Sequence, residues 1–405
     1  MLRRVIKVDK ESCRECGFCI SVNRCMNQDQ CVGCFSCYWA CPYNARKMRI
    51  IDVEEKYVKI RVEGVTYSVI YPSTVKEVLE RLGVVFGKPG SRNLSSPCNI
   101  GGCWACSVII NGRLERTCIT AVKEGMEIEI CTEKTEPLRI VHGPQPHRVG
   151  GKGTPWWEVG VGYIEAAIWV AGCNLRCPQC QNYHVTYDNS SEPMTPREAA
   201  RIVTLCSRKY GTRGVAVSGG EPTLNRRWLI EFFKEARRLN PDKRLHLDSN
   251  GTILTEDYVD ELVEAGCNNI GVEPKASRLE TYMKITGIID RELARSYLEN
   301  SWNIIKYILD NYHGEVYLGV GFAYNREWMT LEEIEEIGDR VASIDRDLQV
   351  TVLDYFPSFR RRDLKRPTVE EMLNVKKKLE DRGLRSVIVQ TSIGHFGPDR
   401  GSRIH

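Results

Sequence analysis

The sequence predicts an α/β protein in which two small cysteine-rich segments precede one larger unit. From about residue 161 to the end, short apolar strands alternate with amphipathic helical stretches, as in a parallel sheet. The number of repeats suits a partial barrel of about six βα units. The part before residue 135 differs because it carries most of the 18 cysteines in closely spaced groups.

Length, charge and cysteine usage limit the class of protein. A chain of 405 residues is long enough for two or three domains, and a net charge of +4 gives no reason to expect nucleic acid or a membrane as partner. The N-terminus lacks an apolar signal region and no later apolar run could cross a bilayer, so a soluble, cytoplasmic protein is expected. Cysteines spaced by two residues in such a protein indicate metal sites rather than disulfides.

The first segment, residues 1–52, contains eight cysteines in two runs. They are Cys13, Cys16, Cys19 and Cys25, then Cys31, Cys34, Cys37 and Cys41. The second run, with Pro42 after it, has the bacterial ferredoxin spacing, and the segment resembles a two-cluster ferredoxin. The resemblance implies two [4Fe-4S] clusters, one on Cys13, Cys16, Cys19 and Cys41, the other on Cys31, Cys34, Cys37 and Cys25. Cys25 departs from the usual interval, and a zinc-binding module is the alternative.

The second segment, residues 55–135, begins with alternating strands over 56–64 and 65–72 and a helix over 74–83. A glycine-rich loop follows with four further cysteines, Cys98, Cys103, Cys106 and Cys118. Asn111 and Gly112 predict a hairpin turn. The spacing resembles the β-grasp [2Fe-2S] domains of succinate dehydrogenase iron-sulfur subunits, which implies one [2Fe-2S] cluster. Gly101 and Gly102 are expected to let backbone amides approach the sulfurs.

Residues 136–160 are rich in proline and glycine and are interpreted as a linker. His142 and His147 are expected to be solvated there, and Trp156 and Trp157 are candidates to cover a domain interface. Three cysteines without a partner at ligand spacing are interpreted as packed thiols, namely Cys131, Cys206 and Cys267.

The third segment, residues 161–405, contains seven predicted strands. They cover residues 163–170, 214–218, 244–248, 268–272, 315–322, 348–354 and 386–390. Three intervening helices are announced by capping boxes, at Thr195 and Glu198, Thr330 and Glu333, and Thr368 and Glu371, and Gly383 ends the last helix. In parallel barrels, the loops at the carboxyl ends of the strands carry the chemistry.

Three cysteines, Cys173, Cys177 and Cys180, follow the first of these strands. Three thiolates can hold three irons of a [4Fe-4S] cube and leave one iron open, as in a catalytic metal site. Gly219, Gly220 and Glu221 follow the second strand. Together the two motifs resemble the radical S-adenosylmethionine (SAM) superfamily, in which the Gly-Gly-Glu segment binds the amino group of methionine. A zinc site or unrelated buried thiols are the alternative, and the second motif alone could be an ordinary strand-to-helix turn.

The next two strands also end in polar residues, Asp248, Ser249 and Asn250 and then Glu273 and Lys275. These positions resemble pyruvate formate-lyase activating enzyme and its relatives, which implies contacts with SAM and a cation site. Ser249 replaces a threonine, and Gln179 replaces the aromatic residue usual before the third cysteine. Asp248 alone could cap a turn. His395 and Arg360 to Arg362 are expected to be solvated loop residues.

The resemblance implies reductive cleavage of SAM to a 5'-deoxyadenosyl radical, with the N-terminal clusters as electron relay and an external low-potential donor. The implied cofactors are SAM, three [4Fe-4S] clusters and one [2Fe-2S] cluster. The first hypothesis is an activase that generates a glycyl radical on a partner protein. The second is a radical SAM enzyme acting on a small molecule or peptide, and the third is a non-enzymatic electron-transfer subunit.

Overall fold

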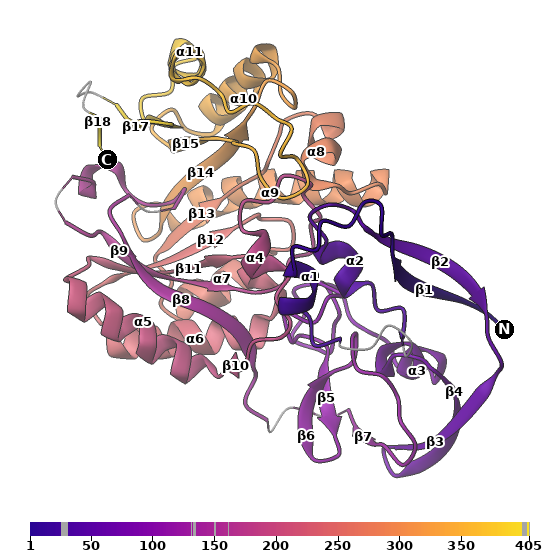
Figure 1. The fold of residues 1–405 in the computed structure, drawn as a ribbon. Coiled ribbons are helices and arrows are strands. Elements are labelled where there is room, and N and C mark those ends of the chain that lie inside the picture. Colours follow the sequence, from indigo (N-terminus) through magenta and orange to yellow (C-terminus); the bar gives the residue numbers. More distant parts are fainter. Residues whose placement is uncertain are drawn as a thin grey trace.

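The structure is a computed structural model that describes residues 1–25, 31–130, 132, 135–149, 151–160, 162–398 and, for the backbone alone, 403–404. The chain forms a large sheet surrounded by helices, with the two N-terminal segments together on one side of it (Figure 1). Among the helices described, none combines the length and the apolar character that crossing a bilayer requires.

The first segment is a two-stranded sheet whose connection carries the cysteines. β1 (Leu2–Val8) pairs antiparallel with β2 (Arg46–Asp52), and two short helices, α1 (Phe18–Ser21) and α2 (Ser36–Ala40), lie between them in the chain. Few of these side chains are fully buried, so the segment has little apolar core of its own.

The second segment is a five-stranded mixed sheet with one helix. Its elements are β3 (Lys56–Val62), β4 (Val65–Tyr71), α3 (Val75–Arg81), β5 (Ser107–Ile110), β6 (Arg113–Arg116) and β7 (Glu127–Glu129). The strand order is β4-β3-β7-β5-β6, and α3 buries Val75, Val78 and Leu79 in the core of this sheet. Thr74 forms a capping box with Glu77, and Asn111 and Gly112 adopt the left-handed backbone of the predicted hairpin turn.

The third segment contains all seven predicted strands as one parallel array. They are β9 (Glu165–Val170), β11 (Gly214–Gly219), β12 (Arg244–Ser249), β13 (Asn269–Val272), β14 (Tyr317–Tyr324), β15 (Gln349–Asp354) and β16 (Val387–Thr391). The helices that follow these strands are α4 (Tyr183–Thr186), α5 (Pro196–Tyr210), α6 (Arg226–Leu239), α7 (Glu256–Glu264), α8 (Leu279–Thr286), α9 (Arg291–Tyr312), α10 (Leu331–Ile344) and α11 (Val369–Asp381). Most of them lie along the outside of the sheet (Figure 1).

The parallel sheet curls around a short stretch of chain. Gly151 donates its backbone N–H to Glu165 on β9, and Thr154 accepts from Gln349 on β15. These strands are five positions apart in the sheet, about 24 Å if it were flat. Thr154 alone contacts both strands, because its hydroxyl donates to Glu165 (3.2 Å) and its carbonyl accepts from Gln349 (2.8 Å), so the sheet curls around residues 151–154.

The predicted linker is mostly structured. β8 (Arg139–His147) pairs antiparallel with β9, and β10 (Pro193–Met194) pairs with β8. His142 and His147 are therefore strand residues, and the expectation of solvated loop residues was wrong. His142 Nε2 lies 2.9 Å from the buried carboxylate of Asp188.

Other expectations for loop and cysteine residues had mixed outcomes. Trp156, in the 3-10 turn Trp156–Glu158, lies against Gly397, and Trp157 is 70% exposed beside Tyr317, so neither covers an interface with the N-terminal segments. Cys206 and Cys267 are buried thiols as predicted, whereas Cys131 lies outside the described residues.

Two of the three capping boxes in this segment have the predicted reciprocal bonds, those of Thr195 and Thr368. At the third, Thr330 accepts from the Glu333 N–H, but the Glu333 carboxylate is used elsewhere. It accepts from the backbone N–H groups of Ser277 and Arg278 before α8 and from the Thr281 hydroxyl. This carboxylate therefore joins α10 to α8 instead of completing the box.

The second segment packs against the sheet without intervening side chains. A Cβ on Gly102 would lie 2.6 Å from the Gly172 nitrogen, and one on Gly172 would lie 2.7 Å from the Cys103 nitrogen. Gly102 is thus required for contact with the sheet unit, and the approach of its amide to a cluster sulfur stays a prediction. Gly172 has φ +85°, a backbone conformation that side chains rarely adopt.

We predict that Gly172→Ala loosens this contact. The added methyl must displace backbone, so the variant should lose about 1 to 3 kcal/mol more stability than Gly314→Ala. Gly314 is the matched control because it has φ +86° but no atom within 4 Å of the added Cβ. Thermal melting and limited proteolysis between the second and third segments measure the effect. Equal destabilisation by both substitutions would contradict the proposed contact.

Candidate active site

The three cysteines after β9 line one chamber of about 130 Å³. Cys173 is buried, and Cys177 and Cys180 are half-buried. Burial raises the pKa of the Cys173 and Cys177 thiols to about 12 and that of Cys180 to about 11. Thiolates in this chamber therefore depend on the positive charge of bound metal, which couples iron binding to proton release.

The Gly-Gly-Glu segment lies beside this loop through backbone contacts. The N–H of Gly220 donates to the carbonyl of Val170 (2.8 Å), and that of Glu221 donates to Gly172 (2.9 Å). A Cβ on Gly219 would lie 2.4 Å from the Val170 nitrogen, and one on Gly220 would lie 2.2 Å from the Gly172 oxygen. Both glycines are needed for the two loops to meet, and both line the chamber.

The Glu221 carboxylate is buried and committed to protein partners. Oε1 accepts hydrogen bonds from Thr223 (N–H, 3.1 Å; hydroxyl, 2.6 Å) and from the Ser249 hydroxyl (2.9 Å). Oε2 accepts the Asn250 N–H at 2.7 Å. The side chain thus joins the ends of β11 and β12, while the backbone of Gly219 and Gly220 faces the chamber. Asn250 Nδ2 also lies 4.0 Å from the Cys173 sulfur.

The Asp248 carboxylate lines the chamber, and one of its oxygens accepts no hydrogen bond from the described residues. Its Oδ1 is buried and has no hydrogen bond in the described part of the chain, and the nearest ion-pair partner is His246 Nε2 at 3.4 Å. It does not cap a turn. A buried carboxylate of this kind is satisfied by a ligand that brings hydroxyl or ammonium donors.

Glu273 and Lys275, at the end of β13, also line the chamber. Lys275 Nζ is 2.9 Å from a Glu273 oxygen, and Lys152 Nζ approaches the same oxygen at 2.9 Å. Burial opposes the charge on Lys275, but Glu273 and the cysteines outweigh it and raise its pKa. The resemblance implied a cation site near Glu273 and Lys275. The structure places the ammonium of Lys152 beside Glu273.

Gln179 points away from the chamber. Its side-chain amide donates to the carbonyls of Tyr355 (2.6 Å) and Phe356 (2.7 Å) and accepts from the Trp328 indole. It therefore ties the cysteine loop to the chain after β15.

A second chamber of about 250 Å³ shares a wall with the first. Lys152, Ser218 and Asp248 line both. Its far side is closed by Trp169 on β9 and by His395, which lies half-buried on β17 (Gly394–Phe396) rather than in a solvated loop. β17 extends the sheet beyond β16, and β18 (Arg403–Ile404) follows it.

The N-terminal cysteines fall into two neighbourhoods. One cavity of about 420 Å³ is lined by Cys25, Cys31, Cys34 and Cys37. Elsewhere, Arg46 donates to the Cys19 sulfur (3.1 Å), and the N–H of the preceding Ala45 donates to Cys41 (3.2 Å). The assignment of cluster ligands that the ferredoxin resemblance implied stays a prediction. Cys98, Cys103, Cys106 and Cys118 are all buried in the second segment.

Two arginines connect these neighbourhoods to the chamber. Arg176, between the first two cysteines of the chamber loop, donates to the carbonyls of Cys173 (2.7 Å) and Cys98, and it lies over the Trp39 ring. Its three partners come from the three segments of the chain.

Arg360 makes a parallel connection. Its guanidinium donates to the carbonyls of Tyr38 (2.8 Å) and Cys41 (3.0 Å) in the first segment. The backbone N–H of Arg360 donates to the carbonyl of Pro178 in the chamber loop. Arg362 donates to the Tyr43 hydroxyl. The expectation that this basic run is solvated was therefore wrong for Arg360, whereas Arg362 is exposed as predicted.

Sequence reasoning missed Lys152, Arg176 and Arg360. Arg176 had a usable signal because it lies inside the cysteine motif. Lys152 and Arg360 had none, since a glycine-rich stretch and a run of arginines are usually solvated.

The donor set suits an iron-sulfur cluster at the chamber loop. Three thiols line one chamber that Gly219, Gly220 and Asp248 also line. Among the described residues, no group of three or more His, Cys, Asp or Glu side chains is placed to hold a single metal ion.

Comparison with known proteins identifies two domains. The Radical SAM superfamily model matches residues 168–332, and the model of the 2Fe-2S iron-sulfur cluster binding domain matches residues 55–133. The chain therefore contains a radical SAM domain, which includes the chamber loop, and a 2Fe-2S binding domain. These two parts of the prediction are confirmed.

The curated relatives match over a limited stretch. The probable GTP 3',8-cyclase of Methanococcus aeolicus is 38% identical over 117 residues, 28% of this chain and 38% of that protein. The GTP 3',8-cyclase of Paenarthrobacter nicotinovorans is 32% identical over 115 residues, 28% of this chain and 32% of that protein. The chain thus spans less than two fifths of the length of these relatives.

Among solved structures, Streptococcus suis SuiB bound to S-adenosylmethionine is 15% identical, with a TM-score of 0.38 over 52% of this chain and 42% of that one.

Beneath the chamber, His246 is buried between two carboxylates. Its Nδ1 lies 3.1 Å from Glu165, and its Nε2 faces Asp248. Burial lowers the pKa of His246, but the two carboxylates outweigh this effect and raise it to about 9. The imidazolium thus stabilises the folded protein fully below the unfolded pKa of about 6.5, and this stabilisation is lost as pH rises through about 9.

We predict that the stability difference between the wild type and His246→Gln depends on pH. The difference in unfolding free energy should shrink by up to about 3 kcal/mol between pH 6.5 and 9.5. Denaturant unfolding of both proteins across this range measures it, and the comparison cancels other titrating groups. A difference that stays constant with pH would contradict a charged His246.

Proposed function

We propose that the protein is a radical SAM enzyme that cleaves S-adenosylmethionine reductively to methionine and a 5'-deoxyadenosyl radical. The observation that carries this proposal is the chamber itself. Cys173, Cys177 and Cys180 line it together with Gly219 and Gly220, and these residues lie within the stretch that matches the Radical SAM superfamily.

The residues of the chamber have distinct roles in this proposal. When bound, a [4Fe-4S] cluster on the three thiolates holds the methionine end of SAM and supplies the electron that cleaves its sulfonium C–S bond. Gly219 and Gly220 accept the amino group through their backbone. Asp248 accepts hydrogen bonds from SAM, and Lys275 brings positive charge beside the carboxylate of Glu273.

We propose that the N-terminal segments relay electrons to this chamber through two [4Fe-4S] clusters and one [2Fe-2S] cluster. Their contacts with the chamber loop support this. Cys103 abuts Gly172, the residue before Cys173, and Arg176 joins the same loop to the Cys98 carbonyl. Cys98, Cys103 and Cys180 belong to one packed apolar cluster with Trp39. An external low-potential donor would reduce the first cluster.

A small molecule is the substrate class that we favour. The relatives reported above are named for GTP, a small molecule, and the second chamber provides a space of about 250 Å³ beside the first chamber. A glycyl-radical protein is the second candidate. It is supported by the similarity of the Asp248–Asn250 and Glu273–Lys275 positions to activating enzymes.

We predict that the reconstituted, anaerobically reduced protein forms 5'-deoxyadenosine and methionine from SAM. Cys177→Ala should lose about four irons and all cleavage while keeping the N-terminal clusters. Iron analysis and chromatography of the products measure both effects. Cys206→Ala is the matched control, because Cys206 is packed away from every chamber cysteine and should change neither readout.

Two outcomes would contradict the proposal. A full iron load without 5'-deoxyadenosine in the wild type would favour an electron-transfer subunit. Loss of all clusters in Cys177→Ala would contradict separate cluster sites.

The substrate class is tested by electron paramagnetic resonance. With SAM, reductant and a candidate glycyl-radical protein, an activase yields a glycyl doublet. We expect no doublet and instead transfer of hydrogen from a small molecule to the 5'-deoxyadenosyl radical, which forms 5'-deoxyadenosine. A persistent doublet would instead favour the glycyl-radical protein over a small molecule as the substrate.

A further inference from the structure

Residues 151–158, here called the inner loop, run along the inside of the curled sheet. Three inward positions on β13 and β14 are glycines, and the loop occupies the space that their side chains would fill. A Cβ on Gly271 would lie 2.7 Å from the Gly153 nitrogen, one on Gly319 would lie 2.5 Å from the Lys152 oxygen, and one on Gly321 would lie 2.2 Å from the Lys152 side chain.

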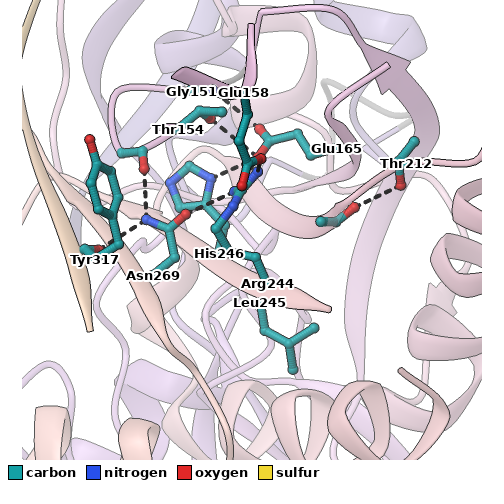
Figure 2. Close-up of polar contacts among 12 residues, drawn as sticks. Gly151, Thr154, Glu158, Glu165, Thr212, Arg244, Leu245, His246, Asn269 and Tyr317 are labelled. Carbon is teal, nitrogen blue, oxygen red and sulfur yellow. Dashed lines mark hydrogen bonds and ion pairs between the residues drawn. The ribbon is translucent and has the colours of Figure 1, made fainter. Parts of the chain in front are cut away.

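Polar side chains on the inner face of the sheet bind this loop. Asn269 donates to the Gly153 carbonyl (2.7 Å), and Thr154 donates to Glu165 (3.2 Å). Arg244 joins Glu165 (3.2 Å) to Glu158 (2.7 Å) at the end of the loop. Figure 2 shows these side chains converging on the loop from β9, β12 and β13. Buried polar groups that bond one another in this way specify a single position for the segment that they hold.

The inner loop delivers one charged side chain to the chamber. Lys152 is largely buried, lines both chambers, and places its Nζ 2.9 Å from Glu273. Burial opposes the charge on Lys152, but Glu273 and Asp248 outweigh it and raise the pKa of the ammonium. Lys275 is the other cation in contact with Glu273, and His246 and Glu165 lie below Asp248.

We propose that Lys152 is a positioning residue of the SAM chamber. Its ammonium compensates the charge of Glu273 and Asp248, so that Glu273 can hold Lys275 in place and Asp248 stays ionised toward SAM. Without it, Glu273 would keep only Lys275 as a cationic partner among the described residues, and Asp248 would depend on His246, which Glu165 also contacts. A buried carboxylate there would then take up a proton or pull Lys275 from its place. This inference rests on the proposed SAM binding.

The test is chemical rescue of Lys152→Ala. In the unreduced, iron-loaded enzyme, we expect SAM to bind about tenfold or more weakly to this variant than to the wild type, by equilibrium dialysis. Adding n-propylammonium, which fits the space left by the side chain, should restore most of the affinity. Propanol has similar size without charge and should not. Lys377→Ala is the control, because Lys377 is 70% exposed on α11 and should respond to neither additive.

Each result is decisive. Unchanged affinity in Lys152→Ala overturns the proposal, and so does equal rescue by propanol and propylammonium, since packing alone would then explain the loss. If Lys152→Ala does not fold, Lys152→Met fills the same space without charge, and wild-type affinity in that variant overturns the proposal. A wild type that binds no SAM instead refutes the proposed function.

Discussion

The close backbone packing around Gly172 is the constraint on which the site depends. Its N–H donates to the carbonyl of Thr186, its carbonyl accepts from Glu221, and its Cα lies against Cys103. One residue thus joins the cysteine loop, the Gly-Gly-Glu segment and the second cysteine-rich segment. Side chains at these positions would push the loops apart, because backbone atoms cannot move aside as flexible side chains can. Small residues here therefore allow both the chamber and the contact with the N-terminal segments.

Two carboxylates near this packing, those of Glu221 and Asp248, have different roles. The Glu221 carboxylate is saturated by Thr223, Ser249 and Asn250, so it acts as a tie between strand ends. Asp248 on the neighbouring strand has an oxygen that accepts no hydrogen bond among the described residues, although it faces His246 at 3.4 Å, and it lines the chamber where a ligand can reach it. A carboxylate that already accepts several hydrogen bonds gains little from another, whereas a buried and unsatisfied one gains much. The sequence alone would have ranked Glu221 as the more direct ligand contact.

The inner loop explains why so many polar residues point into the sheet. Glu165, Arg244 and Asn269 would each be costly inside a protein if they lacked partners. They instead form hydrogen bonds and ion pairs with the loop backbone and with one another. The same arrangement places Lys152 in the wall of the chamber that the three cysteines line. A segment interpreted as a flexible linker is thus the part of the chain that fills the curled sheet.

The sequence by itself determined the local features of this protein. Cysteine spacing located the chamber loop and the 2Fe-2S domain, and apolar alternation located all seven parallel strands, because both signals depend on residues close together in the chain. Only the tertiary structure decided that β8 joins the sheet, that Arg360 binds the first segment and that Lys152 reaches Glu273. These contacts link residues up to 322 positions apart. Such pairings are set by packing geometry, and a glycine-rich stretch has the same composition whether it is a solvated linker or a buried loop.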